Sequence, residues 1–155
     1  MTRWPSPLYE ITTIFHTPLP LAFRWCTDFS PADPGLAGFT SQRKPVKKTA
    51  RQIVFEDLSD EPKGWDWTRW VATLHPPDRW HVEGKGNRGD WTIDYRLTAL
   101  DDERTELAIR GRRRPTAIGP ANPRKAGLER DMGVMWKTYG RVLERDPRRR
   151  PRRRR

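Results

Sequence analysis

Residues 79–100, RWHVEGKGNRGDWTIDYRLTAL, decide the fold because one pairing register sorts every side chain of this segment. A two-residue loop at Asn87-Arg88 folds the segment into two antiparallel strands. One face then carries the apolar pairs Trp80–Tyr95, Val82–Ile93 and Gly84–Trp91. The opposite face carries the pairs His81–Asp94, Glu83–Thr92 and Lys85–Asp90. Because a half-buried antiparallel sheet separates apolar from polar side chains in this way, the segment predicts a hairpin with one face in the core.

The strand pattern continues on both sides of the hairpin. Downstream, a three-residue loop at Asp101-Asp102-Glu103 pairs Leu97 with Leu107 and Tyr95 with Ile109, whereas a two-residue loop would place Arg110 on the apolar face. Upstream, alternating or aromatic-rich runs predict strands over residues 8–15, 42–48, 52–57 and 66–74. Two inward faces are open for the last of these strands: Trp67 with Val71, or Trp70 with Ala72 and Leu74.

Two helices are expected, one near each end of the chain. Thr17 followed by Pro18 is typical of a helix N-cap and first turn, and Leu19, Ala22, Phe23 and Cys26 follow at helical spacing. A linker from Arg113 to Pro123 leads to a long helix over roughly 123–145, which Pro147 ends. The apolar stripe of this helix consists of Leu128, Met132, Met135, Trp136, Tyr139, Val142 and Leu143.

Composition predicts a single domain over residues 1–146 and an arginine-rich, disordered tail over 147–155. Hydrophobic residues make up only 34% of the 155-residue chain, but eight tryptophans supply a large apolar surface. No segment reaches the roughly 20 apolar residues of a membrane span, and the N-terminus lacks the apolar core of a secretory signal. The single cysteine, Cys26, excludes an internal disulfide and a cysteine-rich zinc site. A cytoplasmic location is the expectation.

Two parts of the sequence resemble a known superfamily. The first runs from Ile14-Phe15-His16-Thr17-Pro18 through Phe23 to Thr27-Asp28-Phe29, and the second comprises residues 74–80 and 89–95. Together with the order of elements, these motifs resemble the START-related (SRPBCC) superfamily, in its polyketide cyclase/dehydrase-like branch, over residues 8–145. The resemblance implies an α+β helix-grip fold: a curved antiparallel sheet of six to seven strands around a long C-terminal helix. It also implies a cavity between sheet and helix for a hydrophobic small molecule, and no shared catalytic motif.

Several patterns that resemble catalytic or cofactor motifs have a simpler structural interpretation. Residues 84–89, GKGNRG, match G-x-G-x-x-G, but a strand follows where a dinucleotide site needs a helix. His81 opposite Asp94 has the composition of a general-base pair, yet the register places it on the solvent face. His16 and His75 lack metal-ligand spacing, and Cys26 is interpreted as a small buried hydrophobe. Neither a cofactor nor a metal site is predicted.

The aromatic and methionine side chains that converge between sheet and helix form the candidate ligand site. Its predicted lining residues are Phe55, Trp80, Trp91, Tyr95, Met132, Trp136 and Tyr139. Pockets are mostly apolar with a few polar tips, which Trp and Tyr provide. A hydrophobic small molecule is therefore the expected partner, bound by a carrier or, as an alternative, by a cyclase/dehydratase-type enzyme with Tyr95 or Tyr139 as the polar group. A filled aromatic core is the competing interpretation.

Basic residues give a third class of function. The chain has a formal charge of +11, and seven of these charges belong to the tail arginines Arg148, Arg149, Arg150, Arg152, Arg153, Arg154 and Arg155. A second run contains Arg110 and Arg112, which the register places on the solvent face, followed by Arg113 and Arg114. Such runs favour RNA, an anionic surface or an acidic protein. The competing interpretation is a solubilising tail and an edge strand protected by charge.

Overall fold

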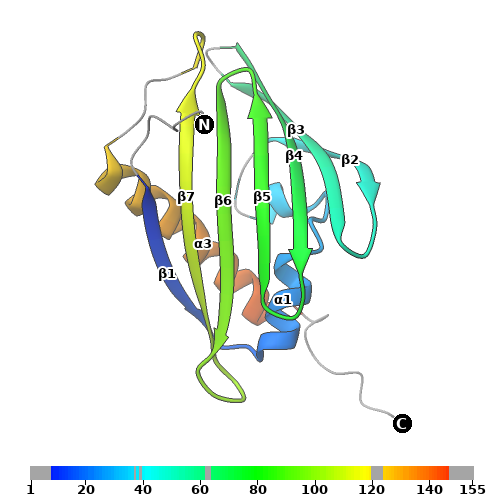
Figure 1. The fold of residues 1–155 in the computed structure, drawn as a ribbon, viewed down its shortest axis with the longest axis vertical. Coiled ribbons are helices and arrows are strands. Elements are labelled where there is room, and N and C mark those ends of the chain that lie inside the picture. Colours follow the sequence, from blue (N-terminus) through cyan, green and yellow to red (C-terminus); the bar gives the residue numbers. More distant parts are fainter. Residues whose placement is uncertain (1–7, 37, 39, 62–63, 120–123, 147–155) are drawn as a thin grey trace.

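In the computed structural model, which describes residues 8–36, 38, 40–61, 64–119 and 124–146, seven strands form one antiparallel sheet that curves around a long helix. The strands lie in the order β1-β7-β6-β5-β4-β3-β2. Figure 1 shows α3 against one face of the sheet and α1 at the end of the sheet where the β4–β5 turn lies. The bounds are β1 Tyr9–Phe15, α1 Leu19–Cys26, α2 Asp33–Leu36, β2 Gln42–Lys48, β3 Gln52–Glu61, β4 Gly64–His75, β5 Arg79–Gly86, β6 Gly89–Ala99, β7 Thr105–Pro115 and α3 Lys125–Arg145.

The central meander has the predicted register. Strands β5 and β6 place Trp80 opposite Tyr95 and His81 opposite Asp94, and β6 and β7 place Leu97 opposite Leu107. The predicted helix-grip architecture is confirmed with seven strands. The structure also decides the open question for β4, because Ala72 and Leu74 are buried and Trp70 packs against the core, while Trp67 is 38% exposed.

The start of α1 differs from the prediction by one residue. Pro18 is the N-cap, with an extended ψ of 144°, and the helix begins at Leu19. Thr17 is fully buried, and its hydroxyl has no partner in the described part of the chain. Its carbonyl instead accepts a hydrogen bond of 2.7 Å from Thr105 Oγ1. Thr17 therefore ties the β1–α1 connection to β7 rather than capping the helix.

The predicted linker from Arg113 is also wrong at its start, because β7 continues to Pro115. Arg113 lies opposite Trp91 in the sheet and is only 5% exposed. Its guanidinium donates a hydrogen bond of 2.7 Å to the Arg88 carbonyl and lies 5.6 Å from the Trp91 ring centroid. A buried arginine that stacks on an indole and bonds to the backbone can occupy an inward strand position.

Helix α3 also protects the free edge of the sheet at β1. The Glu10 backbone N–H donates to Glu129 Oε1 at 3.1 Å, and the His16 N–H donates to Glu144 Oε1 at 3.0 Å. Both carboxylates belong to α3, so they bond to N–H groups of β1 and its C-terminal connection that an edge strand would otherwise leave unpaired. These bonds fix the position of the helix across the concave face.

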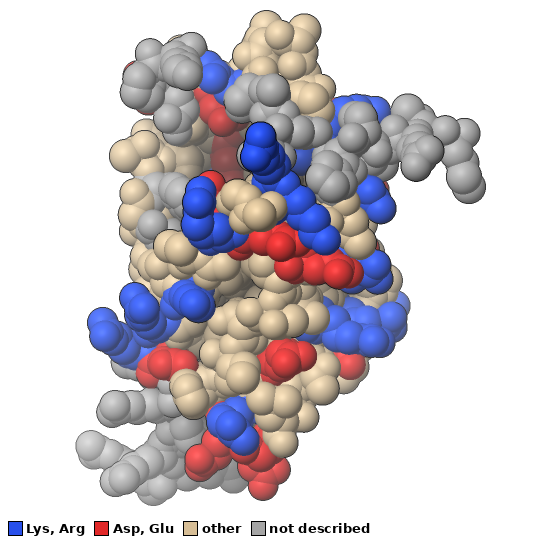
Figure 2. Space-filling view, turned by 90° about the vertical axis from the view of Figure 1, so that its left-hand side faces the viewer, with Lys and Arg blue, Asp and Glu red and all other residues tan. Residues whose placement is uncertain are grey.

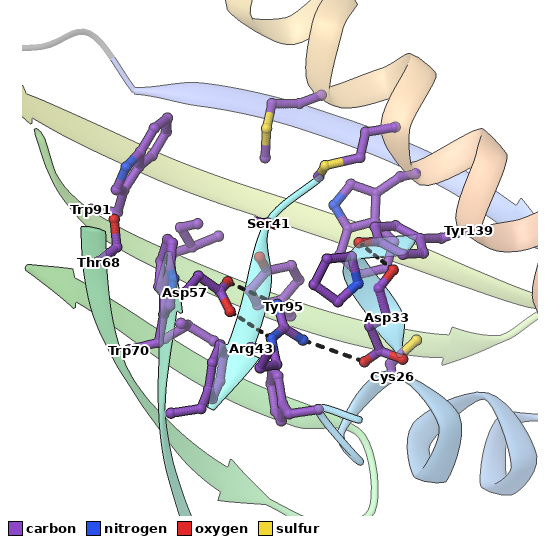
Figure 3. Close-up of a pocket in the computed structure, with 18 of the residues that line it drawn as sticks. Cys26, Asp33, Ser41, Arg43, Asp57, Thr68, Trp70, Trp91, Tyr95 and Tyr139 are labelled. Carbon is purple, nitrogen blue, oxygen red and sulfur yellow. Dashed lines mark hydrogen bonds and ion pairs between the residues drawn. The ribbon is translucent and has the colours of Figure 1, made fainter. Parts of the chain in front are cut away.

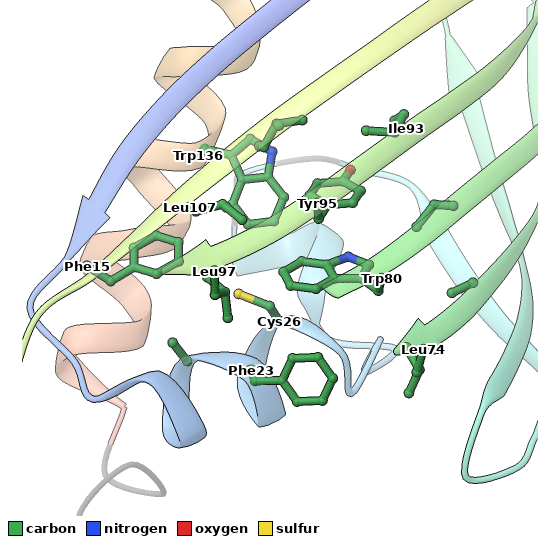
Figure 4. Close-up of a cluster of buried hydrophobic side chains, with 14 of the residues drawn as sticks. Phe15, Phe23, Cys26, Leu74, Trp80, Ile93, Tyr95, Leu97, Leu107 and Trp136 are labelled. Carbon is green, nitrogen blue, oxygen red and sulfur yellow. The ribbon is translucent and has the colours of Figure 1, made fainter. Parts of the chain in front are cut away.

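The core lies between the sheet, α1 and α3 (Figure 4). Trp80 and Tyr95 stack with 4.8 Å between ring centroids and 5° between ring planes. Phe23 of α1 contacts Trp80 edge-on at 6.0 Å, and Trp136 of α3 contacts Tyr95 at 5.6 Å. This row of contacting aromatic side chains runs from α1 through the sheet to α3. It therefore closes one end of the domain.

Candidate ligand-binding cavity

A cavity of about 470 Å³ lies between the sheet and α3, beside this packed core. This volume is within the range of about 300–1,000 Å³ that is usual for small-molecule pockets. Its walls come from β2 to β6, from residues 25–34 around α1 and α2, and from α3. Figure 3 shows the lining side chains pointing from these elements toward the same space.

The structure brings together six of the seven predicted lining residues. They are Phe55, Trp91, Tyr95, Met132, Trp136 and Tyr139. Trp80 is not among the lining residues, because it is 2% exposed and lies against the other face of the Tyr95 ring, between Tyr95 and Phe23. Its place in the predicted site is therefore corrected: Trp80 belongs to the packed core.

One glycine makes room for an indole ring in the cavity wall. Gly84 lies directly opposite Trp70 on one neighbouring strand and Trp91 on the other. A Cβ atom at this position would lie 2.6 Å from the Trp70 ring. The Trp70 ring therefore lies over Gly84, at a position where the neighbouring strand carries no side chain.

Charged residues that the sequence interpretation missed line the β2–β3 side of the cavity. Arg43 binds Asp57 through Nε at 2.8 Å and Nη2 at 3.0 Å, and approaches Asp33 at 3.4 Å (Figure 3). Its guanidinium also lies 4.3 Å from the centroid of Phe55. All three charged side chains are mostly buried, with 12–20% exposed. A signal for this ion pair was available, because the antiparallel pairing of β2 with β3 places Arg43 directly opposite Asp57.

The three tyrosines of the chain are all poor acids in this fold. Burial raises the pKa of Tyr95 well above 10, raises that of Tyr9, and raises that of Tyr139 to about 12. All three phenols are therefore neutral near pH 7 and available as hydrogen-bond donors.

The raised phenol pKa values predict a loss of stability at alkaline pH. An unfolded tyrosine ionises near pH 10, earlier than the folded one, so the stability of the protein is undiminished below pH 10 and falls as the pH rises toward 12 and beyond. Phenolate absorbance in the near ultraviolet should accordingly appear together with unfolding. Phenolate absorbance that appears near pH 10, while the near-ultraviolet circular dichroism of the folded protein persists, would contradict this prediction.

The remaining candidate residues do not join the cavity. His81 Nδ1 and Asp94 Oδ1 are 2.7 Å apart on the opposite face of the sheet, where Asp94 is 73% exposed. The segment Gly84–Gly89 is a hairpin tip, as its spacing indicated. Cys26 lines the cavity and is buried, which raises the pKa of its thiol. The described residues contain no cluster of His, Cys, Asp or Glu suited to a metal ion.

The basic run on β7 is largely engaged within the protein. Arg110 pairs with Glu10 at 2.9 Å, and Arg114 pairs with Asp90 at 2.7 Å, while Arg112 is half-buried. Figure 2 shows basic and acidic side chains interspersed on the side of the molecule where β1 lies. Arg148–Arg155 lie outside the described residues, so the proposed tail site remains a prediction. No helix within the described ranges has the length and apolar character needed to cross a membrane.

Comparison with known proteins identifies the fold. No family model matches the chain, and no curated protein matches it in sequence. Among solved structures, the di-domain aromatase/cyclase StfQ of steffimycin biosynthesis is similar with a TM-score of 0.68 and 15% identity. The match covers 88% of this chain and 45% of StfQ, so the chain spans about half of that protein.

Two further solved structures have similar lengths. The Zhui aromatase/cyclase from Streptomyces sp. R1128 has a TM-score of 0.62 and 12% identity over 89% of this chain and 88% of that one. A START superfamily protein from Mycobacterium smegmatis has a TM-score of 0.64 and 10% identity over 88% and 94%. At these identities the likeness concerns the backbone arrangement alone. Together with the seven-stranded sheet and its α3 helix, it shows that this chain shares the helix-grip fold of these aromatase/cyclase and START superfamily structures.

Proposed function

We propose that the chain binds a small, mostly apolar molecule in the cavity between the sheet and α3. The observation that carries the proposal is that aromatic side chains line a partly open space of about 470 Å³ instead of filling it. Well-packed interiors leave few voids larger than a water molecule. A space of this size, with apolar walls, is suited to an organic ligand.

The composition of the walls supports an apolar ligand with a defined orientation. Trp70 and Trp91 line the sheet side, and Met132 and Met135 lie on the helix side. Methionine side chains adapt to irregular shapes, whereas the indole rings offer flat, rigid surfaces. The Arg43–Asp57 pair gives the cavity one polar side. One end of a bound molecule would therefore contact charged groups, and the other end would contact apolar side chains.

Filling the cavity from the helix should prevent binding. We expect Met132→Trp to weaken an apolar fluorescent probe, such as an anthracene derivative, by at least tenfold, because the new indole occupies the ligand space. Val134→Trp is the matched control, since Val134 is 62% exposed on the same helix and does not line the cavity. Titration of the probe followed by its fluorescence measures both affinities.

The proposal fails if Met132→Trp and Val134→Trp bind the probe as tightly as the unaltered protein. It also fails if the unaltered protein binds none of a panel of apolar aromatic probes and no small molecule accompanies the protein purified from its own cells. Native mass spectrometry followed by solvent extraction decides the second point. A defined co-purifying molecule would identify the class of the natural ligand.

An enzyme of the cyclase/dehydratase type in the same cavity is the second candidate. The specific observation in its favour is that two neutral phenols, Tyr95 and Tyr139, line the cavity together with Arg43. Neutral phenols can donate a proton or a hydrogen bond to a carbonyl oxygen. Tyr95→Phe and Tyr139→Phe should then lower turnover of a poly-β-ketone thioester by more than they lower its binding. Turnover unchanged in both variants would eliminate these residues.

A further inference from the structure

The largely buried side chain of Tyr95 presents to the cavity a hydroxyl that the described part of the fold does not use. Tyr95 is 8% exposed, lies in the middle of β6 and is held between Trp80 on one side and Trp136 on the other. Within the described part of the chain, neither a backbone group nor a side chain hydrogen-bonds to its oxygen. Buried hydroxyls are normally paired, so an unpaired one that lines a cavity points to a partner supplied by a ligand.

A second unpaired donor lies beside it. The Nε1–H of Trp136, a residue that also lines the cavity, is buried without a hydrogen-bond partner among the described residues. Figure 4 shows this nitrogen and the Tyr95 oxygen on the same side of the two rings, toward Ile93, another lining residue. The ring centroids of Trp136 and Tyr95 are 5.6 Å apart. Of the two groups, the Tyr95 hydroxyl faces the space that a ligand can enter, whereas Trp136 Nε1 is closed off from it.

Neighbouring polar groups in the same region are already bonded, which makes the Tyr95 hydroxyl distinct. Trp25 Nε1 donates to Asp146 Oδ2 at 3.1 Å, and Tyr139 Oη reaches the Asp33 carbonyl at 3.5 Å. Both residues line the cavity as well. The fold therefore bonds these two polar groups internally and leaves the Tyr95 hydroxyl available to a ligand.

The charges around the cavity restrict what that ligand group is. Asp33, Asp57 and Asp66 line the cavity against one lining cation, Arg43, which already binds Asp57 with two hydrogen bonds. Arg113, which stacks on the lining Trp91, interacts electrostatically with Asp66. A carboxylate or phosphate in the cavity would therefore find each of these cations already engaged with an aspartate. A neutral phenol donates a hydrogen bond readily. A neutral acceptor therefore fits both the Tyr95 hydroxyl and the charges around the cavity.

We propose that the ligand carries a neutral carbonyl oxygen, as in a ketone or quinone, and that Tyr95 Oη donates a hydrogen bond to this oxygen. This inference rests on the proposed binding function and adds the chemical class of the ligand. The apolar body of the molecule then lies along Trp70, Trp91 and the α3 methionines. A hydrocarbon of the same shape leaves the Tyr95 hydroxyl unpaired and binds more weakly.

Fluorenone and fluorene test the inference, because they share one ring system and differ in the carbonyl group. We expect the unaltered protein to bind fluorenone at least tenfold more tightly than fluorene. In Tyr95→Phe this preference should fall to about twofold or less, because fluorenone loses its hydrogen-bond donor. The carbonyl stretching band of bound fluorenone should lie at lower frequency than in an apolar solvent, and should move back in the variant.

Tyr9→Phe is the matched control. It removes another buried hydroxyl that has no partner in the described chain, but Tyr9 does not line the cavity, so the preference should persist. If Tyr95→Phe does not fold, the carbonyl band of fluorenone bound to the unaltered protein, compared with the band in an apolar solvent, decides the matter. Equal binding of both probes by the unaltered protein, or an unshifted band, overturns the inference and leaves the cavity function intact. Binding of neither probe overturns both.

Discussion

Replacing Trp80 by alanine should lower the free energy of unfolding by about 3–5 kcal/mol, the usual cost of removing a large aromatic side chain from a core. Trp80 is 2% exposed, stacks on Tyr95 and contacts Phe23 of α1. Its removal leaves a large void between the sheet and α1. Since small domains have total stabilities of about 5–15 kcal/mol, this single change removes a large part of the folding free energy.

Urea denaturation followed by circular dichroism measures the Trp80→Ala effect. Trp65→Ala is the control, because Trp65 is 58% exposed on β4 and should change stability by no more than about 0.5 kcal/mol. If Trp80→Ala costs less than about 1 kcal/mol but weakens apolar probes, Trp80 lines the ligand space after all. That result would restore the assignment made from the sequence.

Gly111→Ala should destabilise the protein by about 1–3 kcal/mol, because an added methyl group overpacks the core at this position. Gly111 of β7 is directly opposite Tyr9 of β1, which is fully buried. A Cβ atom on Gly111 would overlap the Tyr9 ring and its hydroxyl. The ring cannot swing away without leaving the core, so the β1–β7 pairing must shift.

Gly133→Ala gives the opposite expectation and serves as the comparison for Gly111→Ala. Gly133 lies inside α3, and a Cβ atom there would meet no atom within 4 Å. Alanine in a helix interior is more favourable than glycine by roughly 1 kcal/mol, so stability should rise. Thermal or urea unfolding of the two variants should give shifts of opposite sign. A stabilising Gly111→Ala would show that the β1–β7 packing is looser than the structure indicates.

Much of the sheet could be predicted because its side chains are sorted locally. In the β5–β6 hairpin, the alternation of apolar and polar residues leaves one register that buries Trp80 and Tyr95 together, and the structure has this register. The same argument predicted a three-residue loop between β6 and β7, and the structure has the register that this loop implies. The stripe on α3 predicted that Met132, Trp136 and Tyr139 face the sheet, and all three line the cavity.

Long-range contacts decided what the local patterns could not. The alternation of β4 contained aromatic residues on both faces, so only the packing against the core distinguished Trp70 from Trp67. Arg113 occupies a core position because Trp91 and the Arg88 carbonyl bind its guanidinium. Nothing in the immediate sequence of Arg113 reveals these partners, and so the run of arginines was interpreted as a linker.

The sequence by itself determined the strand order of the meander, its registers and the helix that crosses it, because periodicity and turn chemistry act between near neighbours in the chain. Only the tertiary structure decided which aromatic side chains fill the core and which surround a space. Trp80 is packed between Tyr95 and α1, whereas Trp91 stands beside Gly84 and faces the cavity. The physical reason is that a void depends on the spacing between the curved sheet, α1 and α3. The periodicity of side chains along the chain does not determine this spacing.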